Sequence, residues 1–217
     1  AEFAEALGDD LEAWGVSLLG GDLVRTPGPM TLTMTLTGRC GAGGPVRRSG
    51  GRVGDDVWVS GEIGAGVLGL EAARGEGDAA LVAGYRVPNC PPLAMAKLVA
   101  DYATGSIDVS DGLLSDVSHL ARESGVGVSL NLERVLLVQP TRDIDSVLHQ
   151  CTGGDDYQTL FSASPDHRGA ISSDADAKGL VLTRIGSLSS GDGLVLLFDG
   201  RRVEPPAALG YVHDTGD

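Results

Sequence analysis

The chain begins with a segment whose apolar residues recur at helical spacing. Phe3, Leu7, Leu11 and Trp14 follow one another at intervals of three or four residues, which places them on one face of a helix. The pattern therefore predicts a helix over residues 1–15, and Gly15 is a typical helix end.

Two segments after this helix have the pattern of strands. Residues 16–19 form a short apolar run that ends in a Gly-Gly-Asp turn. Residues 30–37 alternate methionine or leucine with threonine, and this period of two predicts a strand with one buried face. The threonine face would then either meet solvent or line a pocket.

Strands and helices interleave over the rest of the chain. We expect strands at 57–61, 106–109, 126–132, 159–162, 180–187 and 194–198, and helices at 64–74, 93–103, 111–124 and 165–178. Residues 38–56 are rich in glycine and arginine and predict a linker between two units. Because several successive strands pair as antiparallel neighbours in this scheme, the pattern favours an α+β fold with mixed sheets over a parallel one.

Charge and cysteine usage narrow the classes of function. The formal net charge is −14, from 30 acidic and 16 basic residues, which argues against nucleic-acid binding and against an anionic membrane surface. No apolar run is long enough to cross a bilayer. Cys40, Cys90 and Cys151 are sparse and widely spaced, so we expect a reducing, cytoplasmic location. The acidic excess either serves solubility or includes carboxylates that hold a divalent cation.

The turn Gly20-Gly21-Asp22 is the first candidate for phosphate or metal chemistry. Glycine lets a phosphate approach the backbone closely, exposed amides bind anions, and Asp22 offers a hard oxygen ligand for Mg²⁺. An ordinary turn at a strand end is the alternative.

The segment Asp108-Val109-Ser110-Asp111-Gly112 is the second candidate, since it connects a predicted strand to a predicted helix. Ser110 or Asp111 can cap the helix, whose amides attract anions. A plain cap explains one acidic residue but leaves Asp108 without a role. Two carboxylates around one turn therefore favour a cation site.

Two further segments carry weaker signals. Arg48 lies in the glycine-rich linker and offers donors that match phosphate oxygens, although a solvated charge is the simpler interpretation. Residues 153–157, Gly-Gly-Asp-Asp-Tyr, form a third turn in which Asp155 and Tyr157 could contact a substrate, or which is simply a hairpin turn. The chain lacks a P-loop and the protein-kinase motifs, so any phosphoryl transfer would rely on carboxylate-held Mg²⁺ and backbone amides.

In order along the chain, these motifs resemble those of the thiamine-monophosphate kinase family, in the superfamily of aminoimidazole ribonucleotide synthetase. The resemblance rests on the following segments: Gly20-Gly21-Asp22, Arg47-Arg48-Ser49-Gly50, Gly54-Asp55-Asp56, Asp108-Val109-Ser110-Asp111-Gly112, Gly153-Gly154-Asp155-Asp156-Tyr157 and Gly210-Tyr211-Val212-His213. Asp155 and Gln158 stand where the family usually has glutamate. The resemblance implies ATP-dependent conversion of thiamine monophosphate to thiamine diphosphate.

The same resemblance implies a role for each matching residue. Asp22, Asp111 and Arg48 would be catalytic, and Asp22, Asp108 and Asp111 would bind Mg²⁺. Gly20, Gly21, Arg48 and Ser110 would contact the phosphates of ATP, the co-substrate. Asp155, Tyr157 and Tyr211 would face the thiamine.

The resemblance also implies a two-domain fold of the aminoimidazole ribonucleotide synthetase type, with the first domain only partly present. Residues 1–45 would be the end of an ATP- and metal-binding domain, and residues 46–217 a C-terminal α+β domain. The family's earlier motifs have no counterpart here, and a homodimer is expected when that part is present. The apolar face of residues 30–37 would lack partners in such a fragment.

Two other readings stay open. Another ATP-using member of the superfamily, such as the hydrogenase maturation factor, is one, but no cysteine follows Cys151 to serve as its C-terminal acceptor. A fragment that binds nucleotide or thiamine phosphate without turnover is the other.

Overall fold

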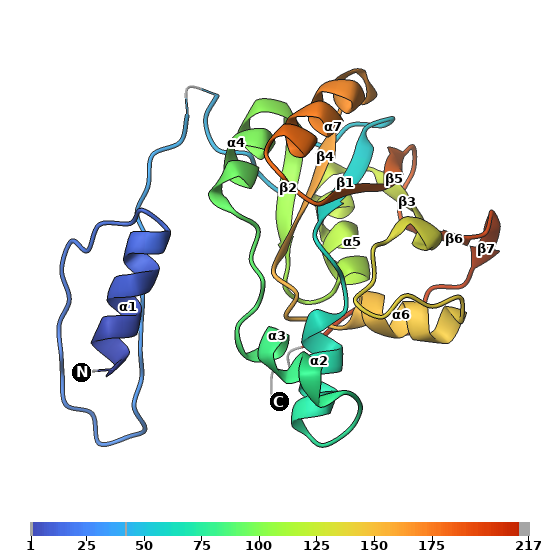
Figure 1. Cartoon of the computed structure of the whole chain (residues 1–217). Coiled ribbons are helices and arrows are strands. Elements are labelled where there is room, and N and C mark those ends of the chain that lie inside the picture. Colours follow the sequence, from blue (N-terminus) through green and yellow to red (C-terminus); the bar gives the residue numbers. More distant parts are fainter. Residues whose placement is uncertain (1, 42, 213–217) are drawn as a thin grey trace. The chain divides into compact units, whose positions relative to one another are not determined.

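The computed structural model describes residues 2–41 and 43–212 and divides the chain into two compact units, Ala1–Cys40 and Gly41–Asp217 (Figure 1). Each unit is described by itself. No helix of the described residues is both long enough and apolar enough to span a membrane.

The first unit holds one regular element in its described part, the helix α1 (Glu2–Ala13). The strands predicted at 16–19 and 30–37 do not form, so both expectations are wrong for this structure. The apolar face of the second segment is exposed, from 62% at Leu32 to 83% at Met30. A strand is stable only when a neighbour accepts its backbone hydrogen bonds and covers its apolar face, and the described part of this unit contains no such neighbour.

The second unit contains the remaining elements. Its strands are β1 (Asp56–Ser60), β2 (Ala103–Val109), β3 (Gly127–Asn131), β4 (Gln158–Ala163), β5 (Leu182–Ser189), β6 (Leu194–Phe198) and β7 (Arg201–Val203). Its α-helices are α2 (Ala65–Ala73), α3 (Val82–Arg86), α4 (Leu93–Tyr102), α5 (Leu113–Ser124), α6 (Ile144–Thr152) and α7 (Arg168–Ala177). Short 3₁₀ turns are η1 (Ala79–Leu81), η2 (Leu132–Arg134) and η3 (Pro165–His167).

The strands of the described residues form one seven-stranded mixed sheet in the order β2-β4-β1-β5-β3-β6-β7. Only β3 and β6 pair in parallel, and the other neighbours are antiparallel. Strand β2 ends at Val109, opposite Gln158 at the start of β4. The loops that follow β2 and precede β4 therefore leave the sheet at the same end, and these loops carry the sequence motifs.

Helices cover both faces of the sheet (Figure 1). One core cluster joins α5 and α6 to Val57 and Leu160. A second cluster places α4 and α7 against Trp58 and Phe161, whose rings stack with centroids 6.4 Å apart. Successive residues of β1 thus point to opposite cores, which explains why the whole strand is buried.

The α+β fold class with a mixed sheet is confirmed, and the predicted elements from residue 57 onward form with small shifts at their ends. The apolar residues at helical spacing within α5 form a stripe that is fully buried: Leu113, Leu114, Val117, Leu120 and Ala121. Helix α6 was not predicted, although Ile144, Val147, Leu148 and Cys151 have helical spacing and Asp143 caps the helix by accepting from the Ser146 amide at 3.0 Å.

The two acidic residues of the Gly54-Asp55-Asp56 segment have structural partners. Asp55 accepts hydrogen bonds from the Arg52 amide and the Thr104 hydroxyl. Asp56 is buried and pairs with Arg168 through both oxygens at 2.8 Å, and with Arg184 at 3.2 Å. These contacts fix the start of β1 and account for the acidic pair without a ligand.

Candidate functional site

Two of the predicted motifs lie against each other at the end of the sheet. The Asp155 amide donates to the Ser110 carbonyl at 2.9 Å, and the Tyr157 amide donates to the Val109 carbonyl at 2.7 Å. A Cβ on Gly154 would lie 2.6 Å from the Ser110 carbonyl oxygen. This position therefore requires glycine, because any side chain would push the two turns apart.

The C-terminal motif joins the same group. The Tyr211 amide donates to the Asp111 carbonyl at 2.8 Å, and the Tyr211 side chain is 63% exposed. Segments that are about 100 and 45 residues apart in sequence thus meet at Asp111. The fold brings together Asp108, Ser110, Asp111, Asp155, Tyr157 and Tyr211.

A buried carboxylate binds the backbone of the turn after β2. One Asp116 oxygen accepts hydrogen bonds from the amides of Ser110, Asp111 and Gly112, at 3.0, 3.0 and 3.1 Å. Burial raises the pKa of Asp116, while these amide bonds act in the opposite direction. The protein's own carboxylate therefore already binds the amides that were expected to attract phosphate.

The turn before β4 has an unusual backbone. Asp155 has φ of 68° and Tyr157 has φ of 51°, a left-handed conformation that side chains larger than glycine rarely adopt. The Tyr157 hydroxyl donates to the Asp155 carboxylate at 3.0 Å, and this bond raises the pKa of Tyr157 above its usual value. Each residue in such a conformation costs free energy and persists only where the surrounding structure imposes it. These conformations cluster at ligand-binding sites, where the strain can serve function.

The middle residue of that turn points inward. Asp156 is 2% exposed, and its two oxygens accept the Gly64 and Gly66 amides at 2.9 and 3.0 Å. Burial raises the pKa of Asp156 to about 6, and the amides at the start of α2 offset part of that rise. Asp156 thereby joins the turn before β4 to the first turn of α2.

One group of possible metal ligands lies at this end of the sheet, within the described residues. Ligand atoms of Asp111, Asp116 and His119 all lie within 4.8 Å of one another. However, the Arg122 guanidinium can only donate, so its 2.7 Å contact makes Nδ1 of His119 an acceptor and leaves the ring proton on Nε2. The imidazole then has no lone pair for a metal, and carboxylate oxygens are the donors that remain. Such hard donors fit Mg²⁺.

The comparison with known families agrees with this geometry. The family described as AIR synthase related protein, C-terminal domain, matches residues 52–199, which is more than half of the chain. The chain belongs to this family. The match spans β1 to β6 and includes both turns at the end of the sheet.

Relatives within the AIR synthase related family extend over most of the chain. Thiamine-monophosphate kinase from Caulobacter vibrioides is 36% identical over 222 residues, covering 97% of this chain and 62% of the relative. The crystal structure of thiamine-monophosphate kinase from Stenotrophomonas maltophilia K279a is 31% identical with a TM-score of 0.61, covering 73% of this chain and 54% of that one. The predicted resemblance to thiamine-monophosphate kinase is confirmed.

A third comparison carries ligands. A structure described as AaThiL complexed with AMPPCP and TMP is 29% identical, with a TM-score of 0.56, and covers 77% of this chain and 54% of that chain. The present chain spans about three fifths of the length of the first curated relatives. The activity of the whole protein is therefore a matter for proposal.

Four predicted residues remain, of which three belong to the first unit and Arg48 belongs to the second. Gly20, Gly21 and Asp22 belong to the first unit, where they are exposed, and the Asp22 carboxylate accepts the Leu23 amide at 2.8 Å. The Arg48 carbonyl accepts a hydrogen bond from the hydroxyl of Ser124, the last residue of α5. Asp111 precedes the first residue of the same helix, so the two residues lie near opposite ends of α5. Gly105, next to Arg48, is separated from Asp111 by roughly 20 Å of extended chain. The second unit alone does not bring Arg48 to the Asp111 group.

Two residues of this site, Asp116 and Asp156, were not among the predicted ones. Asp116 lies in the first turn of α5, where an acidic residue often binds free amides, but the predicted helix began two residues earlier, at Asp111. No local signal marked Asp156, since its partners Gly64 and Gly66 are about 90 residues away in sequence.

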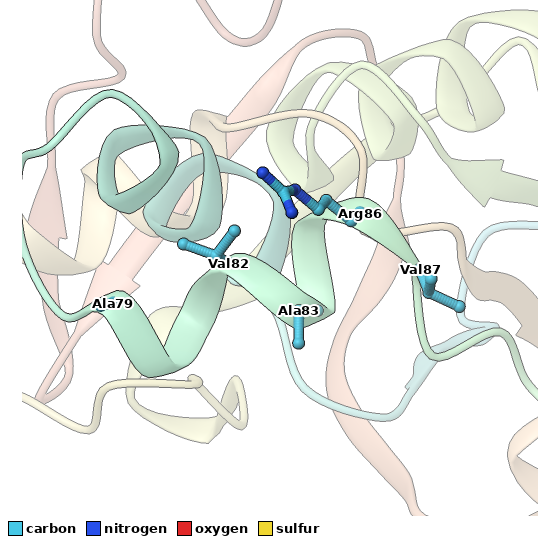
Figure 2. A pocket seen from close by; sticks show the side chains of 6 residues that line it. Ala79, Val82, Ala83, Arg86 and Val87 are labelled. Atoms are coloured by element: carbon cyan, nitrogen blue, oxygen red, sulfur yellow. The ribbon is translucent and has the colours of Figure 1, made fainter.

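A hollow also lies along η1 and α3, lined by Ala79, Val82, Ala83, Gly84, Arg86 and Val87 (Figure 2). These residues come from one short segment, and they do not include any of the predicted site residues. The motif-bearing end of the sheet therefore remains the candidate site.

Proposed function

We propose that the protein transfers the γ-phosphoryl group of ATP to thiamine monophosphate, giving ADP and thiamine diphosphate. A terminal phosphate oxygen of thiamine monophosphate would form the new bond to the γ-phosphorus while the bond to the β-phosphate oxygen breaks. The observation that carries the proposal is the meeting of residues 108–112, 153–157 and 210–211 at one end of the sheet. It supports the proposal because these segments carry the resemblance to thiamine-monophosphate kinases.

The arrangement suits this acceptor. The substrate is already a phosphate, so no strong general base is required, and positioning with charge neutralisation supplies most of the catalysis. Asp155, Tyr157 and Tyr211 would contact the thiamine, whose thiazolium ring is cationic. Their exposed or half-buried side chains leave them accessible, and the Asp155 carboxylate complements a positive ring.

Asp108 and Asp111, with Asp22 from the first unit, would hold Mg²⁺. When bound, this ion neutralises the charge on the phosphate oxygens. The Ser110 hydroxyl would donate to a phosphate, while Gly20, Gly21 and Arg48 would contact the phosphates of ATP. Asp22, Asp111 and Arg48 keep the catalytic roles that the resemblance implies.

The same resemblance supports three further proposals. Residues 1–45 would be the end of an ATP- and metal-binding domain and residues 46–217 the C-terminal domain. A homodimer would form when the family's N-terminal part is present, and it would cover apolar side chains of the first unit such as Leu32 and Met34, which are 62% and 68% exposed. The sparse thiols, of which Cys40 and Cys90 are exposed and unpaired, suit the cytoplasm.

The test is a comparison of Asp111→Asn with Asp143→Asn, a carboxylate change at the cap of α6. Asp111→Asn removes a charge from the proposed Mg²⁺ site, so we expect the Mg²⁺ concentration for half-maximal formation of thiamine diphosphate to rise about tenfold or more. Asp143→Asn should leave that concentration unchanged. Equal Mg²⁺ dependence in the two variants would contradict the assignment of Asp111.

A further inference from the structure

We propose that Asp156 is a positioning residue that holds Asp155 and Tyr157 in the orientation needed to receive the thiamine group. The inference rests on the proposed function for the identity of the substrate. It assigns Asp156 no contact with the substrate, since the side chain is 2% exposed and points away from the site.

The first argument is the alternation of side chains along the turn. Asp155 is half-buried and Tyr157 is 40% exposed, whereas Asp156 between them is buried. The hydrogen bond between the Tyr157 hydroxyl and Asp155 shows that the two flanking side chains lie on the same side. The inward residue therefore determines where both outward residues point.

The second argument is the cost of the backbone. Two left-handed residues, neither of them glycine, cost about 1–3 kcal/mol each and persist only where the surroundings impose them. The surroundings here are the Asp155 and Tyr157 amides, which donate to Ser110 and Val109, and the Asp156 carboxylate. Of these hydrogen bonds, only those to the carboxylate connect the turn to α2, against which Gly153 and Gly154 also pack closely.

The third argument concerns the backbone amides at the start of α2. Amides at the start of a helix attract anions, and those of Gly64 and Gly66 bind Asp156. The protein thus uses an internal carboxylate where a ligand anion would otherwise fit. Asp156→Asn replaces one acceptor oxygen with a donor, which would face an amide N–H, so one of these bonds is lost.

The kinetic test compares Asp156→Asn with Asp143→Asn, which also removes a carboxylate that accepts a backbone amide at a helix N-terminus. We expect Asp156→Asn to raise KM for thiamine monophosphate about tenfold or more, with kcat and KM for ATP within about threefold of wild type. Asp143→Asn should change none of the three. If Asp156 had only a structural role, the substitution would reduce the amount of folded protein, so the apparent kcat would fall in proportion while both KM values stayed unchanged. That result would overturn the inference.

A second test needs neither turnover nor a variant that folds. In the wild-type protein, amide hydrogen exchange at Gly64 and Gly66 should follow exchange at Asp155 and Tyr157, because the Asp156 carboxylate links both segments and Gly66 packs closely against Gly154. We expect protection factors within about threefold of one another and the same dependence on urea. A wider spread, or separate urea dependences, would overturn the inference. If the wild type forms no thiamine diphosphate, the proposed function fails, while the exchange data still decide the role of Asp156.

Discussion

At the scale of single residues, buried carboxylates that accept backbone amides organise the site. Asp116 holds the turn after β2 and Asp156 holds the turn before β4. Burial removes a carboxylate from water, which costs free energy, and hydrogen bonds from amide donors recover part of that free energy. The balance makes the stability of the protein depend on pH in a way that can be measured.

Asp156 should make the wild-type protein less stable as the pH rises from about 4 to about 6. Its pKa is about 6 in the folded protein against an ordinary value of 3.8, so in this range the folded state binds more protons than the unfolded state. Relative to Asp156→Asn, the wild type should lose roughly 3 kcal/mol across this range. Urea unfolding at pH 4, 5, 6 and 7 measures the difference.

The control for this prediction has the opposite sign. Hydrogen bonds from Ser146 lower the pKa of Asp143, so its contribution is present above its ordinary pKa and is lost as the pH falls through the lowered value. Asp143→Asn should therefore differ from wild type in pH dependence only below about pH 4. A flat difference between wild type and Asp156→Asn from pH 4 to 7 would contradict the assignment.

Gly112 should tolerate alanine far less well than Gly125, although both flank α5 with positive φ. Gly112 has φ of 125° and a Cβ there would lie 2.6 Å from the Thr152 carbonyl oxygen, whereas a Cβ on Gly125 would meet nothing within 4 Å. Gly125→Ala should lower the free energy of unfolding by about 1 kcal/mol through backbone strain alone. Gly112→Ala should lower it by about 3 kcal/mol, because a steric clash adds to the strain. Equal losses in urea unfolding would show that the two turns are not in close contact.

At the scale of elements, the start of β1 depends on one ion-pair group. Asp56 is buried and pairs with Arg168 at the start of α7 and with Arg184 of β5. Asp56→Asn should lower the free energy of unfolding by about 2 kcal/mol, because charge-assisted hydrogen bonds to a buried carboxylate are lost. Asp101→Asn, which breaks the exposed pair with Lys97, is the control and should have little effect in thermal or urea unfolding. A similar small loss for both variants would refute this role.

The sequence predicts a helix or strand well where the side that its local pattern marks as apolar is also the side that packs in the folded protein. It predicts poorly where an element depends on a partner from elsewhere in the chain. The apolar stripe of α5 indicated its buried face correctly. Residues 30–37 have an equally clear strand pattern, but a strand needs a neighbour, which local pattern does not supply. For the candidate site, the sequence motifs contain Asp111 and Tyr157, whose segments the fold brings together, whereas Asp156 was not predicted because its partners come from α2. The distance of Arg48 from Asp111 likewise depends on the length of β2 and α5.

At the scale of the whole molecule, the described hydrophobic core lies entirely in the second unit, where its first member is Val57. Residues 41–217 expressed alone should therefore keep the urea unfolding transition of the whole chain, within about 1 kcal/mol, since a domain with its own core folds independently. Loss of a cooperative transition in this fragment would show that the first unit contributes to folding.

The proposed chemistry requires both units, because Asp22 belongs to the first unit and Asp108 and Asp111 belong to the second. The central claim is thus tested most directly by incubating the purified, folded protein with ATP, Mg²⁺ and thiamine monophosphate and measuring the products. We predict ADP and thiamine diphosphate in equal amounts, formed only when Mg²⁺ is present. No thiamine diphosphate at saturating concentrations of both substrates would contradict the account.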